Sequence, residues 1–252
     1  MTQTTELQGT VALVTGASSG IGEATAVALA ARGASVALVA RRRDRLEALA
    51  ARLDGALVIE ADITDREQAQ SAVARTVSEL GRLDTLINNA GVMLLGPIEN
   101  APLQEWEELV HVNVLGLLYT SHAALPHLLA AADGAPRHLS DLVNISSVAG
   151  RVARNGSGVY NLTKHGVGAF SESLRQEVTG RHVRVSLIEP GAVSTELVSH
   201  NRPEIQEAIG QRFGQIERLE AEDIAETIAF VVTRPRHVAI NEVLIRPTEQ
   251  EG

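Results

Sequence analysis

The chain has 252 residues, a formal net charge of −9 and no cysteine, so it is long enough for a large core but has no disulfide or thiolate chemistry. The negative charge argues against nucleic acid or an anionic membrane as a partner. No apolar run approaches the ~20 residues of a membrane span, and the start lacks a signal-peptide core, so we expect a cytoplasmic protein. Strands and helices alternate without a linker, which favours one domain over residues 1–252.

The first predicted strand, residues 11–14, leads into a glycine-rich turn and then a helix over residues 23–32. This order is the context in which such a turn binds a dinucleotide, because free N–H groups at the helix start face the pyrophosphate. An ordinary glycine-rich turn is the alternative interpretation. The residues of the turn predicted to bind a cofactor are Gly16, Ser18, Ser19, Gly20, Ile21 and Gly22.

The end of the second predicted strand, residues 35–40, indicates which dinucleotide is bound. NAD-binding proteins usually carry an acidic residue here to hold the ribose 2′-hydroxyl. This chain has three arginines instead, and a guanidinium holds a 2′-phosphate in a bidentate grip. The sequence therefore predicts NADP(H), with Arg41 as the first candidate contact and Arg42 as the second. The alternative is a solvated basic helix start paired with Asp44.

Two more strands are predicted over residues 56–60 and 83–87, each followed by polar residues. Strand ends near a topological switch point face the ligand. Asp62, with Ile63 beside it, is a candidate acceptor for the adenine amine, although it would equally serve as a helix N-cap. The strand over residues 83–87 leads into Asn89, Ala90 and Gly91, which are predicted to line the face of the cavity that binds the cofactor.

An apolar loop over residues 92–103 is predicted to form a wall of a substrate pocket. A long helix is expected over residues 103–129, with Asn113 in its interior. Asparagine is a mediocre helix former, and its apolar neighbours here indicate burial, so its amide needs hydrogen-bond partners.

A further strand over residues 139–146 precedes a helix over residues 158–177 that carries Tyr160 and Lys164. Residues four apart share one face of a helix. A nearby cation favours a phenolate and lowers the pKa of the tyrosine, so the pair is a candidate acid–base unit. A surface pair is the alternative.

The last elements are a strand over residues 183–188, a helix over residues 221–233 and a strand over residues 241–245. Residues 196–219, the least regular part of the chain, are predicted to form a mobile lid. The alternation of strands and helices predicts an α/β fold: one doubly wound Rossmann-type domain with a seven-stranded parallel sheet, order 3-2-1-4-5-6-7, and helices on both faces.

Taken together, the motifs strongly resemble the short-chain dehydrogenase/reductase family over residues 7–248. They are Thr15-Gly16-x-x-x-Gly20-x-Gly22, Asn88-Asn89-Ala90-Gly91, Asn113, Ser147, Tyr160-x-x-x-Lys164 and Pro190-Gly191. They occur in the order and spacing of that family.

The resemblance implies a role for each of four residues in catalysis. Tyr160 would transfer the proton at the substrate oxygen, and Ser147 would polarise that oxygen, with Ser146 as its rival. Lys164 would lower the Tyr160 pKa and bind the nicotinamide ribose, and Asn113 would fix a water linked to Lys164. The remaining cofactor contacts that it implies are Pro190, Gly191, Val193 and Thr195.

The resemblance further implies an NADP(H)-dependent oxidoreductase acting on an aldehyde, ketone or alcohol, without a metal, usually as a homotetramer and less often as a homodimer. Within the family, the likeness is to NADP-dependent bacterial members that reduce clavulanic-acid-type aldehydes or oxidise serine and 3-hydroxy acids. An NAD-dependent alcohol or hydroxysteroid dehydrogenase is the runner-up, and a non-catalytic NADP(H) sensor is the third alternative. Either Arg151 or Arg154 is a candidate ligand for a substrate carboxylate. The other pocket candidates are Met93, Leu94, Leu95, Val148, Ala149 and Asn155.

Overall fold

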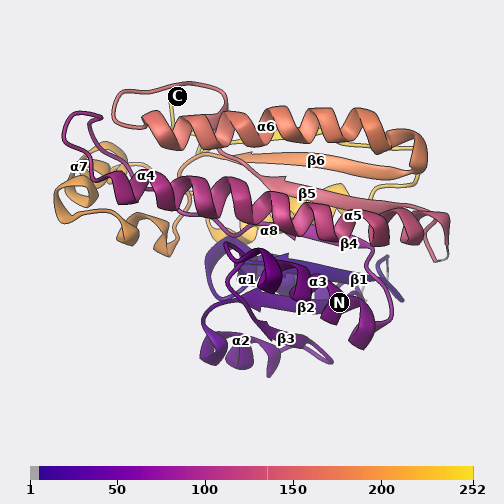
Figure 1. Ribbon diagram of the computed structural model, residues 1–252. Helices are drawn as coiled ribbons and strands as arrows, with labels where there is room; N and C mark the ends of the chain where they lie inside the picture. Colours follow the sequence, from indigo (N-terminus) through magenta and orange to yellow (C-terminus); the bar gives the residue numbers. More distant parts are fainter. Residues whose placement is uncertain (1–5, 135, 252) are drawn as a thin grey trace.

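The computed structural model describes residues 6–134 and 136–251, which form a parallel sheet covered by helices on both faces (Figure 1). The strands are β1 (Val11–Thr15), β2 (Ser35–Ala40), β3 (Leu57–Glu60), β4 (Thr85–Asn88), β5 (Ser140–Ile145), β6 (Val183–Pro190) and β7 (Glu242–Ile245). Their order is β3-β2-β1-β4-β5-β6-β7, so the predicted fold class and topology are confirmed. The order reverses between β1 and β4, which is where a doubly wound sheet leaves a crevice for a ligand.

The helices lie within a few residues of the predicted ranges, except that the helix expected over residues 103–129 is divided and a further helix lies within residues 196–219. The α-helices are α1 (Gly20–Ala30), α2 (Arg43–Ala50), α3 (Arg66–Leu80), α4 (Leu103–Val110), α5 (Leu117–Asp133), α6 (Gly158–Val178), α7 (Pro203–Phe213) and α8 (Ala221–Val232). The shorter helical segments are a π-helix, η1 (His111–Gly116), and three 3₁₀ turns, η2 (Val148–Gly150), η3 (Thr179–Arg181) and η4 (Glu196–His200).

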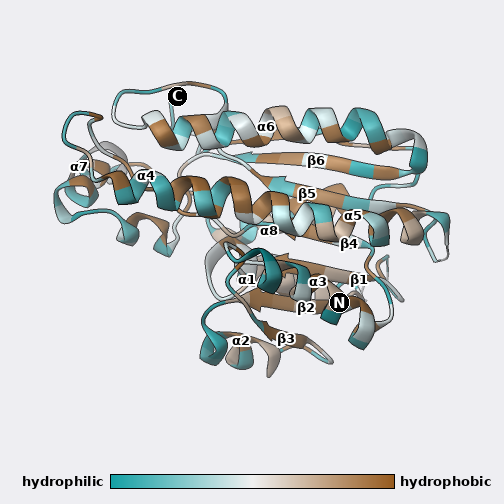
Figure 2. Ribbon diagram, viewed as in Figure 1, coloured by the Kyte–Doolittle hydropathy of each residue, from teal (hydrophilic) through white to brown (hydrophobic). Residues whose placement is uncertain are grey.

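Two apolar clusters, one on each face, hold the helices to the sheet. Along β1, Val14 packs with residues of α1 and α8, whereas its neighbour Leu13 packs with residues of α3 and α5. Side chains alternate between the faces of a strand, so a strand buried on both faces reads as a continuous apolar run. Figure 2 shows the resulting hydrophobic colour of the central strands, and Figure 1 shows α5 and α6 running alongside each other over β5 and β6.

Two helical predictions need correction. The helix expected over residues 103–129 runs to Asp133 and is interrupted by η1. The segment 196–219 is more regular than expected, because Pro203 is pre-organised for the first position of a helix and starts α7.

Of the residues that the structure describes, one helix, the continuous run Leu103–Asp133, is long and apolar enough to cross a membrane. It packs against α3, β4 and β5, as a core helix does.

Candidate active site

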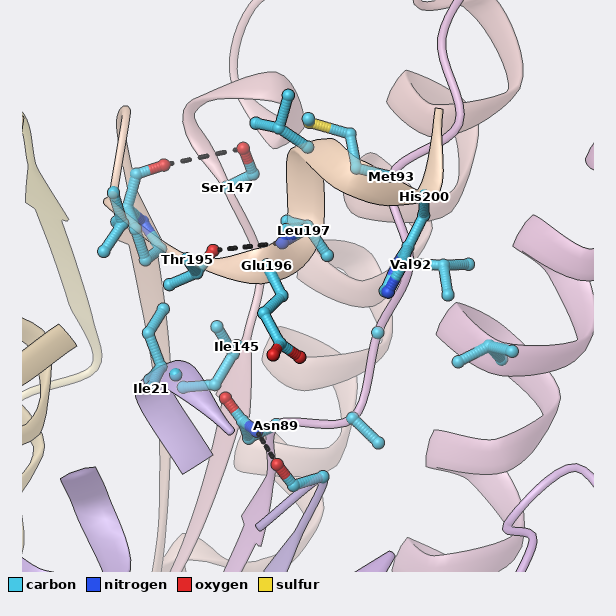
Figure 3. Close-up of a pocket in the computed structure, with 18 of the residues that line it drawn as sticks. Ile21, Asn89, Val92, Met93, Ile145, Ser147, Thr195, Glu196, Leu197 and His200 are labelled. Carbon is cyan, nitrogen blue, oxygen red and sulfur yellow. Dashed lines mark hydrogen bonds between the residues drawn. The ribbon is translucent and has the colours of Figure 1, made fainter. Parts of the chain in front are cut away.

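A cavity of about 420 Å³ lies along the carboxyl ends of the strands. Figure 3 shows side chains from distant segments converging on it, among them Ile21, Asn89, Ser147 and Thr195. Gly22 and Asn113 lie behind its wall. The predicted site residues that line it are Gly16, Ser18, Ser19, Gly20, Ile21, Arg41, Arg42, Asp62, Ile63, Asn89, Ala90, Gly91, Ser147, Tyr160, Lys164, Pro190, Gly191, Val193 and Thr195. Tertiary folding thus brings nearly the whole predicted set to one place.

The turn after β1 is packed too closely for side chains at two positions. Gly16 has a φ of +66°, and a Cβ atom there would lie 2.8 Å from the Cα atom of Ala90. A Cβ atom on Gly22 would lie 2.3 Å from the carbonyl oxygen of Gly16, so α1 sits directly on the turn. The first N–H groups of α1 have no intrahelical partner and present a positive dipole end. The cradle and its donors fit the pyrophosphate of a dinucleotide.

Arg42, more than Arg41, belongs to this cradle. Its guanidinium donates to the hydroxyl of Ser18 from Nε at 3.1 Å and from Nη2 at 2.9 Å, and to the hydroxyl of Ser19 at 2.7 Å. Arg41 extends outward with 69% of its side chain exposed, and its closest charged partner is Asp62 at 4.0 Å. Arg42 thus contacts the glycine-rich turn directly, whereas Arg41, which the sequence ranks first, lies at the cavity edge.

Asp62 is not the N-cap of α3. That role belongs to Asp65, whose carboxylate accepts from the N–H groups of Glu67 and Gln68 at 2.8 and 3.0 Å. The Asp62 carboxylate accepts from the backbone and the hydroxyl of Thr64 at the cavity edge. Asp62 therefore stays available at the end of the cavity farthest along the sheet from Tyr160.

Tyr160 and Lys164 are presented by the first turns of α6, and both are buried. The Lys164 ammonium donates to the carbonyl oxygen of Ile145 at 2.9 Å and lies 5.8 Å from the centre of the Tyr160 ring. The Ser147 hydroxyl accepts from the N–H of Ala149 at 3.1 Å and donates to the carbonyl oxygen of Pro190 at 3.5 Å, and it lies near enough to Tyr160 to favour the phenolate. The hydroxyl of its rival, Ser146, instead donates to the carbonyl oxygen of Lys164. The structure thus selects Ser147 as the partner of Tyr160.

Burial controls the protonation of this pair. Desolvation raises the pKa of Tyr160 to about 12, and the nearby Ser147 hydroxyl lowers it by less. Desolvation also lowers the pKa of Lys164 to about 8. In the protein alone the net shift of the Tyr160 pKa is therefore upward, because burial of the phenolate dominates. That Lys164 lowers the Tyr160 pKa during catalysis stays a prediction.

Asn113 lies in the π-helix η1 and closes the wall behind Lys164. Its amide accepts from the N–H of Val92 and donates to the carbonyl of Val92, both at 2.9 Å, and it also donates to the Thr163 hydroxyl at 3.3 Å. The expected burial and partners of this amide are present. Single π-turns inside α-helices occur often at functional sites, and here the extra residue aims Asn113 at the loop after β4.

Of the two arginines predicted as ligands for a substrate carboxylate, only Arg154 lines the cavity. Arg151 donates to Glu189 at 2.6 Å and also pairs with Glu242, so it lies outside the lining. Arg154 lines the cavity, and no acidic side chain within the described residues lies at ion-pair distance from it. Of the other candidates, Leu94 is core and Asn155 lies outside the lining, whereas Met93, Leu95, Val148 and Ala149 line the cavity.

Two side chains that support the site escaped the sequence analysis. Asn201 accepts from the N–H of Leu95 and donates to the carbonyl of Met93, both at 2.8 Å, and so joins η4 to the apolar loop. Gln250 accepts from the N–H of Ala192 at 2.9 Å. No local pattern reports contacts between residues so far apart, and no signal in the sequence would have found them.

Comparison with known proteins agrees with this geometry. The short chain dehydrogenase family model matches residues 10–206. An uncharacterized oxidoreductase of Staphylococcus aureus (strain MRSA252) is 36% identical, with 96% of this chain and 99% of that protein aligned. Glycine betaine reductase of Emericella nidulans is 40% identical over 97% of this chain, which spans only 19% of the length of that protein.

Solved structures give the same result. The closed form of serine dehydrogenase complexed with NADP+ superposes with a TM-score of 0.88 and 32% identity, covering 96% of each chain. The 3-ketoacyl-(acyl-carrier-protein) reductase of Brucella melitensis complexed with NADH has a TM-score of 0.83 and 29% identity, covering 95% of this chain and 98% of that one.

The fold and the cavity define an α/β oxidoreductase with a nicotinamide dinucleotide crevice. The chain belongs to the short-chain dehydrogenase family. The predicted family resemblance is confirmed.

Proposed function

We propose that this protein is an NADP(H)-dependent oxidoreductase that interconverts an aldehyde or ketone and an alcohol, with Tyr160 as the proton donor and acceptor. The observation that carries the proposal is the contact of Tyr160 with Ser147 beside Lys164, in the cavity that contains the glycine cradle. When bound, the nicotinamide supplies the hydride that the carbonyl carbon receives.

Side chains of the protein bind and protonate the carbonyl oxygen of the substrate. Ser147 donates a hydrogen bond to the carbonyl oxygen, and Tyr160 transfers its proton to that oxygen as negative charge develops there. With a pKa of about 12, Tyr160 is protonated at neutral pH, so the protein alone is poised for reduction. Lys164 then stabilises the phenolate, and Asn113 positions the wall beside Lys164.

The cofactor preference rests on the end of β2. Arg42 lies on the phosphate turn, and Arg41 at the cavity edge adds positive charge, so a 2′-phosphate would meet guanidinium groups. Solved relatives with bound cofactors include one with NADP+ and one with NADH, so the family alone leaves both open. The arginines favour NADP(H).

Arg154 supports a finer proposal about the substrate. The acidic side chains of the described cavity lining are Asp62 and Glu196, which lie at the 2′-phosphate and adenine end. The end near Tyr160 has Arg154 and apolar walls. We propose a small carbonyl compound that bears a carboxylate, held by Arg154, with residues 196–219 acting as its lid.

The family resemblance and the surface support a cytoplasmic homo-oligomer, a tetramer or dimer. Leu162 on α6 is 65% exposed and Leu244 on β7 is 44% exposed, although large apolar side chains are usually covered. Light scattering on the purified protein measures the mass, and a monomer would contradict this proposal.

The function is tested by NADPH and NADH oxidation with neutral aldehydes and with matched aldehydes that bear a carboxylate. Tyr160→Phe should lower kcat by at least about 1000-fold while NADPH affinity stays within about twofold, because it removes only the hydroxyl that carries the transferred proton. Tyr119→Phe, at the other tyrosine of the chain, is the matched control. Full turnover in Tyr160→Phe would overturn the mechanism.

The same panel tests Arg154. Arg154→Gln should raise KM about 10-fold or more for the carboxylate-bearing aldehydes only, as expected for loss of a charge-assisted pair. Arg175→Gln, on the exposed face of α6, is the control. An equal rise in KM for neutral aldehydes would contradict the substrate class.

A further inference from the structure

One acidic side chain bridges Arg42, which follows β2, and Arg45 in the first turn of α2. Glu196, the first residue of η4, accepts from Nη1 of Arg42 at 2.8 Å and from Nη1 of Arg45 at 2.6 Å, one through each carboxylate oxygen. Arg42 is the same side chain that donates to Ser18 and Ser19 in the phosphate turn. The Glu196 carboxylate therefore occupies the same guanidinium groups, those of Arg42 and Arg45, that would bind a 2′-phosphate. It lies 154 residues from Arg42 in the sequence.

A carboxylate and a phosphate make the same kind of contact with arginine, since both offer pairs of oxygens to the guanidinium fork. Two guanidinium groups cannot hold both anions with the same donors. Glu196 therefore competes directly with any anion that binds to Arg42 and Arg45. Arg42 Nη1, which Glu196 takes, is the donor that the serines leave free.

The ion pairs are of a kind that a ligand can displace. The exposed fractions of the three side chains are 41% for Arg42, 44% for Arg45 and 43% for Glu196. Ion pairs open to water contribute little net free energy because solvent screens them and long side chains lose freedom. A phosphate dianion carries more charge than a carboxylate and would win the exchange.

We infer that Glu196 is a specificity-determining residue: an internal anion that occupies Arg42 and Arg45 until the 2′-phosphate of NADP(H) displaces it. This inference rests on the proposed preference for NADP(H). Neighbouring residues of η4, among them Leu197 and Val198, line the substrate cavity. When the 2′-phosphate displaces Glu196, the first residue of the proposed lid therefore loses its ion pairs with Arg42 and Arg45.

The test is direct binding of NADP+ and of NAD+ by titration calorimetry, without substrate or turnover. Glu196→Gln keeps the shape of the side chain and removes its charge. It should tighten NADP+ binding about three- to tenfold, the scale of releasing exposed ion pairs, and should leave the Kd of NAD+ within about twofold. Glu172→Gln is the matched control, because Glu172 makes an exposed pair with Arg175 on α6.

A double-mutant cycle with Arg42→Ala measures the share of the effect that Arg42 carries. In the Arg42→Ala background, Glu196→Gln should tighten NADP+ binding less than it does in the wild type, because only the pair with Arg45 is then released. An equal gain in both backgrounds would contradict an exchange at Arg42. An unchanged or weaker Kd for NADP+ in Glu196→Gln, with wild-type preference for NADP+ intact, would overturn this inference alone. A wild-type protein that binds NAD+ as tightly as NADP+ would overturn the proposed cofactor preference and the inference with it. Unaltered circular dichroism shows that the variants are folded.

Discussion

Burial sets the chemistry of the two residues at the centre of the site. Tyr160 and Lys164 both sit where water is excluded, and exclusion of water disfavours whichever form is charged. The tyrosine therefore holds its proton more firmly and the lysine less firmly than in water. The sequence suggests a tuned pair, but the direction of tuning depends on desolvation.

The Lys164 pKa predicts a rise of stability with pH. Between the folded value of about 8 and the ordinary value of 10.5, the unfolded chain binds more protons than the folded chain, so the free energy of unfolding rises with pH. Relative to Lys164→Met, the wild type should gain about 1–2 kcal/mol between pH 8 and pH 9.5 in urea denaturation. A difference that does not change with pH would contradict the shift.

The same pKa can be read directly. Lys164 is the only lysine in the sequence, so lysine labelled at Cε gives a single side-chain signal by NMR. Its titration midpoint should fall near pH 8 in the protein without cofactor. A midpoint near 10.5, the value of an exposed lysine, would show that the ammonium is hydrated.

At the scale of elements, the glycine turn fixes the distance between β1 and α1. Gly22→Ala would put a methyl group 2.3 Å from the carbonyl oxygen of Gly16, so the helix must move away from the turn. We expect a loss of about 2 kcal/mol or more in the free energy of unfolding and a weaker Kd for NADP+.

A glycine in α6 provides the matched control. Gly166 is exposed, and apart from its chain neighbours and the backbone of its own helix, no described atom lies within 4 Å of a Cβ built there. Gly166→Ala should raise the free energy of unfolding by about 0.5–1 kcal/mol through helix propensity and leave the Kd unchanged. Equal effects of the two substitutions in denaturation and calorimetry would mean that close packing at Gly22 does not matter.

At the scale of the whole molecule, Asn201 joins segments more than a hundred residues apart. It is 5% exposed and hydrogen-bonded to the backbone of Met93 and Leu95. Asn201→Ala removes both bonds, so η4 and α7 should open more often. A glutamate-specific protease should cut after Glu204 about tenfold faster, as expected for the loss of one or two buried hydrogen bonds.

Ser199→Ala is the control for this prediction. The Ser199 hydroxyl donates to the carbonyl oxygen of Glu196 inside the same turn, so its loss releases no distant segment. Cleavage rates followed by mass spectrometry should rise for Asn201→Ala alone. A similar rise in both variants would place the weakness within η4 and not in its contact with the loop after β4.

The sequence by itself determined the sheet and the set of site residues. Strands buried on both faces read as unbroken apolar runs, and glycine and asparagine mark their ends, so alternation predicts the fold class. The family motifs in their order then indicate the strand order. The carboxyl ends of parallel strands share one edge, so residues at those ends must meet. Local pattern and topology suffice for this much.

Only the tertiary structure decided how neighbouring side chains differ in their contacts. Arg42 contacts the glycine-rich turn whereas Arg41 points outward, Ser147 lines the cavity near Tyr160 whereas Ser146 donates to Lys164, and Arg154 lines the cavity whereas Arg151 does not. Each difference depends on partners distant in sequence: Arg42 meets Ser18 and Glu196, and Arg151 is held by Glu189 and Glu242. Adjacent residues share composition and local propensity, so only the direction of each side chain in the packed fold, and the charges and burial that it meets there, separates them.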